Sequence, residues 1–215
     1  MNYVNLYTQT EYSMLSSNLA IDKLVSSAIE RNYEALGIAD NDNMHGAVKF
    51  YTACKSKGIT PIIGVRITLD SAYGYDNAIL LYAKNNNGYR NLLKITTKRS
   101  TTKDKINIFD IKDLLSDLVV TIPSDEHELV KAYVNSDFEG MQKILKDYLS
   151  LKEINNLSLY LGLDLQTKNS KYMLGDLIYF AKQNGITPVA IRKTNYLDDE
   201  DYELYKILRS VDLGG

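Results

Sequence analysis

The sequence predicts an α/β fold in which about seven strands form a largely parallel sheet that can close into a barrel. The first observation is residues 35–69, where an apolar run, a polar turn, an amphipathic segment and a β-branched run follow one another as a βαβ unit. The second is that further apolar runs alternate with helical patterns along the chain. The third is an internal echo, because K-G-I-T-P-I-I at residues 57–63 is similar to N-G-I-T-P-V-A at residues 184–190. Both segments join a helix end to a strand start.

The elements follow from apolar spacing and turn residues. In chain order, strands are expected at residues 3–6, 35–39, 59–69, 78–83, 118–122, 157–165 and 187–191. Helices are expected at residues 21–29, 44–57, 89–96, 109–115, 124–133 (with Ser124 as the cap), 138–149, 171–183 and 198–208. Polar residues 8–17 and 98–105 are expected to be loops.

Two helices have faces that can be specified. Ser17 or Asn18 is expected to cap the first helix, whose buried face comprises Ile21, Leu24, Val25, Ala28 and Ile29. In the central unit Asp42 and Asn43 are expected to cap the helix, and Gly58 to supply the left-handed residue after it. Its buried face is expected to comprise Ala47, Val48, Tyr51 and Cys54.

Composition limits the class of protein. The 215 residues, 45% hydrophobic and 24% charged, suit one globular domain. A net charge of -2 argues against an autonomous nucleic-acid-binding module. The single cysteine, Cys54, falls among helix core positions and is expected to act in packing. With neither a basic leader nor an apolar stretch of about eighteen residues, the chain is expected to be soluble and cytoplasmic.

General catalytic motifs are absent from the sequence. There is no phosphate-binding glycine loop, no paired-cysteine motif and no G-x-S-x-G, and His45 and His127 are the two histidines. Both histidines are expected at helix starts facing solvent. The polar turn at residues 40–43 follows a strand, where side chains of βαβ units converge on ligands, so it is the place to expect chemistry. It lacks the glycine and distal glutamate of a calcium loop.

Residues 39–66, A-D-N-D-N-M-H-G-A-V-K-F-Y-T-A-C-K-S-K-G-I-T-P-I-I-G-V-R, resemble the PHP domain that begins the α subunit of bacterial DNA polymerase III. The family pattern there is roughly T-D-H-x-N-M-x-G-A-x-x-F-x-x-A-x-x-x-G-I-x-P-I-x-G-x-E. Residues 6–15, L-Y-T-Q-T-E-Y-S-M-L, are similar to the family's L-H-x-H-[ST]-x-[YF]-S-x-L. Residues 80–93 and 196–211 also match in order. The resemblance implies a distorted (β/α)7 barrel, and a single PHP domain over residues 1–215.

The ligand positions of the family have lost their ligands in this sequence. In metal-binding members His, Asp and Glu side chains at the strand ends bind metals for phosphoester hydrolysis. By resemblance, the corresponding positions here are Tyr7, Gln9, Asp40, Asn41, Arg66, Ala78, Lys193 and Asn195. Asp40 alone keeps the family residue. We therefore expect no catalytic residues and no metal or other cofactor in this fragment, since one carboxylate beside two new cations cannot hold a dinuclear site.

The resemblance implies an N-terminal fragment of a replicative polymerase, a nucleotidyltransferase whose magnesium site would lie in a region that this chain lacks. Because the match begins at Met1, we expect the subunit type that starts with this domain. The expected role is structural and partner-docking, with the rest of the polymerase chain, a proofreading exonuclease and other replisome subunits as partners. DNA would be contacted only through the full-length protein, and no membrane is expected. The alternatives are a metal-dependent phosphoesterase or 3′–5′ proofreading exonuclease domain, and a standalone regulator.

A buried carboxylate at a former metal site needs a substitute for the metal charge. We expect Arg66, Lys193 or both to neutralise Asp40, because an unpaired buried carboxylate is costly. The alternative is that both long side chains reach solvent and that water fills the pocket.

Overall fold

The computed structural model describes residues 4–71, 73–75, 77–166, 171–212 and 214. The chain divides into two compact units. Unit 1 comprises residues 1–65 and 192–215, and unit 2 comprises residues 66–191. Among the described residues no helix is long and apolar enough to cross a membrane.

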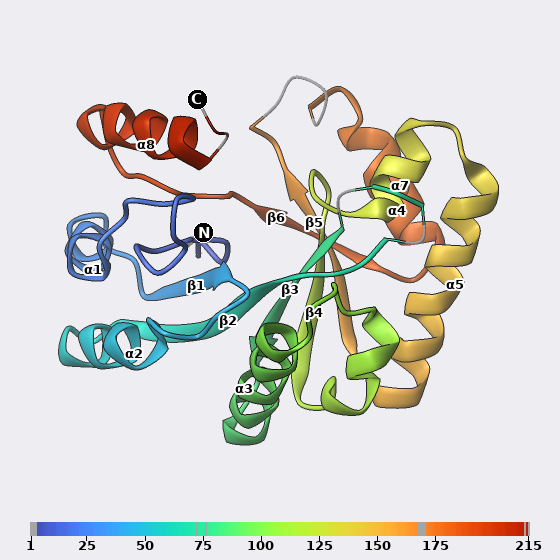
Figure 1. Cartoon of the computed structure of the whole chain (residues 1–215), viewed down its shortest axis with the longest axis horizontal. Helices are drawn as coiled ribbons and strands as arrows, with labels where there is room; N and C mark the ends of the chain where they lie inside the picture. Colours follow the sequence, from blue (N-terminus) through green and yellow to red (C-terminus); the bar gives the residue numbers. More distant parts are fainter. Residues whose placement is uncertain (1–3, 72, 76, 167–170, 213, 215) are drawn as a thin grey trace. The chain divides into compact units, whose positions relative to one another are not determined.

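Helices and strands alternate along most of the chain, as the sequence predicts (Figure 1). The strands are β1 (Ala35–Asn41), β2 (Thr60–Thr68), β3 (Ala78–Ala83), β4 (Leu118–Pro123), β5 (Ser158–Asp164) and β6 (Thr187–Ile191). The helices are α1 (Ile21–Glu30), α2 (Ala47–Ser56), α3 (Asn86–Thr101), the 3-10 helix η1 (Ile108–Leu114), α4 (Glu128–Val134), α5 (Phe138–Asn155), α7 (Leu174–Gln183) and α8 (Asp199–Asp212). The α/β class is therefore confirmed.

The strand order is β1-β2-β3-β4-β5-β6, and the boundary between the units falls within β2. β4 pairs in parallel with β5, and β5 pairs in parallel with β6. β3 and β4 are antiparallel, with Leu81 opposite Val120, so the sheet is mixed and less parallel than predicted.

The strand predicted at residues 3–6 is not formed by its described residues. The chain there is joined to β1 by single backbone hydrogen bonds. Gly37 N donates to Asn5 O at 2.9 Å, and Ala39 N donates to Thr8 O at 2.8 Å. On its other side Thr8 makes an isolated parallel bridge with Thr194. These scattered bonds do not form a continuous ladder, which explains why six strands are found in the described part of the chain where seven were predicted.

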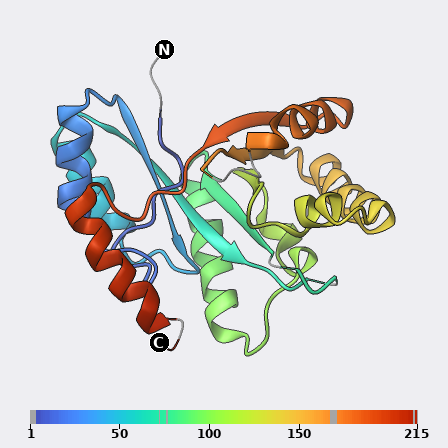
Figure 2. The ribbon, with the colours of Figure 1, turned by 90° about the horizontal axis from the view of Figure 1, so that it is seen from above.

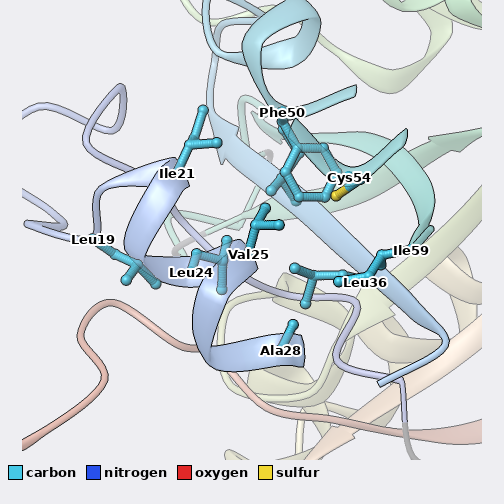
Figure 3. Packing of buried hydrophobic residues seen from close by; sticks show 10 residues of the cluster. Leu19, Ile21, Leu24, Val25, Ala28, Leu36, Phe50, Cys54 and Ile59 are labelled. Carbon is cyan, nitrogen blue, oxygen red and sulfur yellow. The ribbon is translucent and has the colours of Figure 1, made fainter. Parts of the chain in front are cut away.

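Unit 1 has its own apolar core between α1, α2 and β1 (Figure 3). Four of the five residues predicted for the α1 face are buried, whereas Ile29 is 41% exposed. The predicted face of α2 is partly wrong, because Val48 and Tyr51 are exposed and Phe50 is buried with Ala47 and Cys54. The difference is one of helix phase, since residues at positions i, i+3 and i+7 define the buried stripe. α8 lies beside α1, where Lys23 bridges Asp198 and Asp201.

In unit 2 two helices pack on strands and two helices pack on each other. α3 packs on β3, α7 packs on β5 and β6, and α4 lies against α5 (Figure 2). α3 continues to Thr101, through part of the segment predicted as a loop at residues 98–105. Its last turn is closed by bonds from Thr101 Oγ1 to Thr97 O and from Thr102 N to Lys98 O.

Two predicted helix caps in unit 1 and one in unit 2 are wrong. The N-cap of α1 is Ala20, without a side-chain bond, whereas Ser17 accepts from Leu19 N within the preceding turn. α2 starts after Gly46 with no side-chain cap, and Asn43 Oδ1 instead accepts from His45 N at 3.1 Å. α4 is capped by His127 and not by Ser124.

Candidate functional site

Asp40 stands near the end of β1, where the sequence predicted chemistry, and is 2% exposed. Three donors hold its carboxylate. Thr10 N and Thr10 Oγ1 donate at 2.6 and 2.7 Å, and Ser13 Oγ donates at 2.6 Å. Both donor residues lie in the turn that follows the extended segment, so the turn folds over the strand end and the carboxylate fixes its shape.

The predicted ion pair between Asp40 and a cation is wrong. The bonds to this carboxylate come from Thr10 and Ser13, and Arg66 Nε instead donates to Glu126 Oε2 at 2.6 Å. Burial raises the pKa of Asp40 above its ordinary value, although the bonds from Ser13 and Thr10 oppose this shift. The Asp40 carboxylate is therefore stabilised by hydroxyl and backbone amide donors, and not by the cation that we predicted.

Three of the predicted metal-site positions form a chain of side-chain amides. Asn195 Nδ2 donates to Gln9 Oε1 at 2.6 Å, and Gln9 Nε2 donates to Asn41 Oδ1 at 2.5 Å. The direction of the chain is fixed by a backbone group, because Asn195 Nδ2 also donates to Ser16 O at 2.6 Å and a carbonyl oxygen can only accept. Gln9 is fully buried, and both the oxygen and the nitrogen of its side-chain amide are bonded in this chain of amides.

Two serine hydroxyls tie the amide chain to the backbone. Ser17 Oγ lies 2.8 Å from both Gln9 O and Asn195 O. Ser13 Oγ, which donates to Asp40, accepts from Asn41 N at 3.0 Å. The residues that carry Asp40 and the amide chain are thus held by one connected set of hydrogen bonds from uncharged donors.

The two remaining predicted positions in unit 1, Tyr7 and Lys193, form a cation–π contact. Lys193 Nζ lies 5.6 Å from the centroid of the Tyr7 ring, and Tyr7 is 1% exposed. A ring face attracts an ammonium group electrostatically. The structure therefore brings Tyr7 and Lys193 together, as their alignment to ligand positions implied, but in a contact that requires no metal.

Arg66 and Ala78 belong to unit 2. The Arg66 guanidinium is bound by Glu126 and by Thr68 Oγ1, the latter at 2.9 Å. Ala78 is buried at the start of β3, and its backbone N donates to Glu126 O at 2.8 Å. Neither position offers a metal ligand.

The two histidines have different environments. His45 is exposed, as predicted. The prediction for His127 is wrong, because this residue is fully buried and its Nδ1 accepts from Leu129 N at 3.0 Å. Its Nε2 therefore carries the proton and donates to Tyr148 OH at 2.8 Å. Burial lowers the pKa of His127 to about 3, so the ring is neutral and serves as a helix cap.

Cys54 is fully buried, and burial raises the pKa of its thiol to about 11, which agrees with the predicted packing role.

The hydroxyl residues of the site were missed by the sequence analysis. Thr10 and Ser13 fall in a segment that was predicted only as a polar loop, and Ser17 was predicted only as a possible helix cap. A signal for two of them existed, because Thr10 and Ser13 occupy the [ST] and S positions of the motif at residues 6–15. For Ser17 we find no such signal.

These donors do not fit a dinuclear metal centre. A pair of divalent metal ions needs several carboxylate or imidazole ligands. The side chains around Asp40 are instead hydroxyls and amides that already form hydrogen bonds with Asp40 or with one another. Within the part of the chain that the structure describes, no group of three or more His, Cys, Asp or Glu residues is placed to hold a metal ion.

Comparison with known proteins identifies the family. A sequence model of the PHP domain matches residues 5–168. The chain belongs to the PHP domain family. This PHP chain is 30% identical over 218 residues to DNA polymerase III subunit alpha of Halalkalibacterium halodurans, covering 98% of the chain and 19% of that relative. It is 27% identical over 219 residues to the same subunit of Bacillus subtilis, covering 100% of the chain and again 19% of the relative. The chain thus spans about a fifth of the length of these relatives.

Solved structures confirm the PHP-like fold. An amidohydrolase from Chromobacterium violaceum superposes with a TM-score of 0.61 at 9% identity, covering 95% of this chain and 96% of the other. A two-domain protein from Bacteroides vulgatus that contains a predicted PHP-like metal-dependent phosphoesterase gives a TM-score of 0.54 at 10% identity, covering 94% of this chain and 55% of the other. At such identities these likenesses establish the fold of the PHP chain and not its activity.

Proposed function

We propose that this chain is the N-terminal PHP module of a DNA polymerase III α subunit and that the module is structural and does not hydrolyse phosphoesters. The observation that carries the proposal is the amide chain Asn195–Gln9–Asn41, which fills ligand positions of the family with side chains bonded to one another. An uncharged amide nitrogen is a poor metal ligand, and the side-chain oxygens of Gln9 and Asn41 already accept hydrogen bonds.

The parent protein in this proposal is a DNA-directed DNA polymerase of the cytoplasm that acts in DNA replication. Similarity along the whole chain to the α subunits supports this assignment. The magnesium-dependent transfer of nucleotides belongs to the remainder of such a chain. The module would support that remainder and offer a surface to other replisome subunits, including a proofreading exonuclease.

The alternative function is a metal-dependent phosphoesterase or 3′–5′ exonuclease working in this domain. Its support is the fold, which it shares with a predicted PHP-like metal-dependent phosphoesterase. It requires a metal to displace the neutral bonds around Asp40, and no histidine remains at the aligned ligand positions to compensate.

The two functions are separated by metal content and hydrolysis. The protein is purified without chelators, its manganese, zinc and iron are measured, and hydrolysis of bis-p-nitrophenyl phosphate and of single-stranded DNA is assayed with added manganese. A structural module contains far less than one metal per chain and shows the same background hydrolysis as its Asp40→Ala variant. About one metal per chain, together with hydrolysis that Asp40→Ala abolishes, would establish the alternative.

A further inference from the structure

Unit 1 contains a cavity of about 160 Å³ that the function proposed above does not use. None of the predicted metal-site positions lines it. Its floor is apolar, since Leu24, Ala28 and Leu36 contribute to the lining and also belong to the core of this unit (Figure 3). Its lining includes Arg31 and Arg192 and no aspartate or glutamate. The cavity therefore combines an apolar floor with an excess of positive charge.

Both guanidinium groups are available to a ligand. Arg31 ends α1 and Arg192 follows β6, and both residues are exposed. Within the described ranges neither side chain makes an ion pair or a hydrogen bond. Arginine stays charged at any physiological pH, and its planar fork can donate two bonds to one phosphate group.

The carbonyl groups at the end of α1 do not require an arginine side chain as a cap. Arg31 N donates to Ser27 O at 3.1 Å, Asn32 N to Ile29 O at 2.9 Å and Tyr33 N to Ala28 O at 2.9 Å. Backbone amides thus satisfy the carbonyl groups that an arginine side chain would otherwise cap. Asn32 makes this possible by adopting a left-handed conformation with φ of 56°.

The cavity lining also includes an aromatic ring, against which two further rings pack. Tyr196 lines the cavity, is 36% exposed, and packs its ring against Tyr202 and Tyr205 at centroid distances of 5.1 and 5.3 Å. A ring held in this way presents a fixed apolar surface to a flat group such as a nucleobase.

We propose that this cavity binds a phosphate anion, with Arg31 and Arg192 on the phosphate and the apolar floor and Tyr196 on any organic group that the phosphate carries. The chemistry shared by all candidate ligands is the phosphate anion, whose source is either free inorganic phosphate or a nucleotide. The competing explanation is that the two arginines are solvated surface charges, of which Arg31 simply complements the helix dipole.

Binding is measured by calorimetric titration of the intact 215-residue chain with inorganic phosphate, thymidine monophosphate and thymidine. The variants are Arg31→Ala and Arg192→Ala, and the matched control is Arg90→Ala, which removes an exposed arginine from α3. We expect saturable binding of both phosphate-containing probes. Each cavity variant should weaken binding about tenfold or more, whereas Arg90→Ala should leave it unchanged.

The probes also identify the source of the phosphate. Tighter binding of the monophosphate than of inorganic phosphate, with weak or no binding of thymidine, indicates a nucleotide, and equal affinity indicates free phosphate. Absence of saturable binding by either phosphate probe at millimolar concentration would refute the proposal, as would affinities unaltered in both cavity variants. The result is independent of the structural role proposed above, because metal content and hydrolysis do not enter the measurement.

Discussion

Replacing Gln9 with alanine tests whether the amide chain stabilises the protein. The change removes the acceptor of Asn195 Nδ2 and the donor to Asn41 Oδ1. Asn195 Nδ2 keeps its bond to Ser16 O, whereas Asn41 Oδ1 loses the bond that Gln9 donates to it. At about 1 kcal/mol for each bond, with a similar amount for the one buried methylene group that is lost, the free energy of unfolding should fall by about 3 kcal/mol.

The assay is urea unfolding followed by far-UV circular dichroism and by tyrosine fluorescence, which the 17 tyrosines and the absence of tryptophan make suitable. With a urea slope of about 2–3 kcal/mol per molar, the midpoint should fall by about 1 M. The control is Gln142→Ala, which makes the same truncation at an exposed position of α5 and should change stability by less than about 0.5 kcal/mol. If the Gln9 and Gln142 variants unfold at the same urea concentration, the amide chain does not support the fold and the reasoning fails.

Three further predictions concern stability. Leu24→Ala, in the core of unit 1, should cost about 2–5 kcal/mol in denaturant melts, and a loss below about 0.5 kcal/mol would contradict the packing. Burial lowers the pKa of His127 from 6.5 to about 3, so the free energy of unfolding should fall by up to about 1.4 kcal/mol per pH unit as pH drops through that interval. This slope should vanish in His127→Asn, because asparagine can still cap the helix but does not titrate. Because burial raises the pKa of Asp40 above 3.8, the stability deficit of Asp40→Asn relative to wild type should shrink as pH rises above that value, and a deficit that grows would reverse our interpretation.

Much of the fold was predictable because it depends on local spacing. β3 and β6 have the predicted bounds, and the stripe formed by Ile21, Leu24, Val25 and Ala28 is buried as predicted. These features depend on residues close in sequence, where apolar period and turn chemistry are sufficient. In α2 apolar spacing found Ala47 and Cys54 but chose Val48 and Tyr51 in place of the buried Phe50.

The sequence determined the family, and it predicts the loss of the family's metal ligands, because both are read from residue identity at aligned positions. It could not determine which groups bond to Asp40. Charge suggested that Asp40 would meet Arg66, but short-range donors from a turn 30 residues earlier reach the carboxylate, and Arg66 pairs with Glu126, 60 residues further along the chain. A buried polar group takes the partner that the folded backbone brings within hydrogen-bond distance, and that choice is made by tertiary structure.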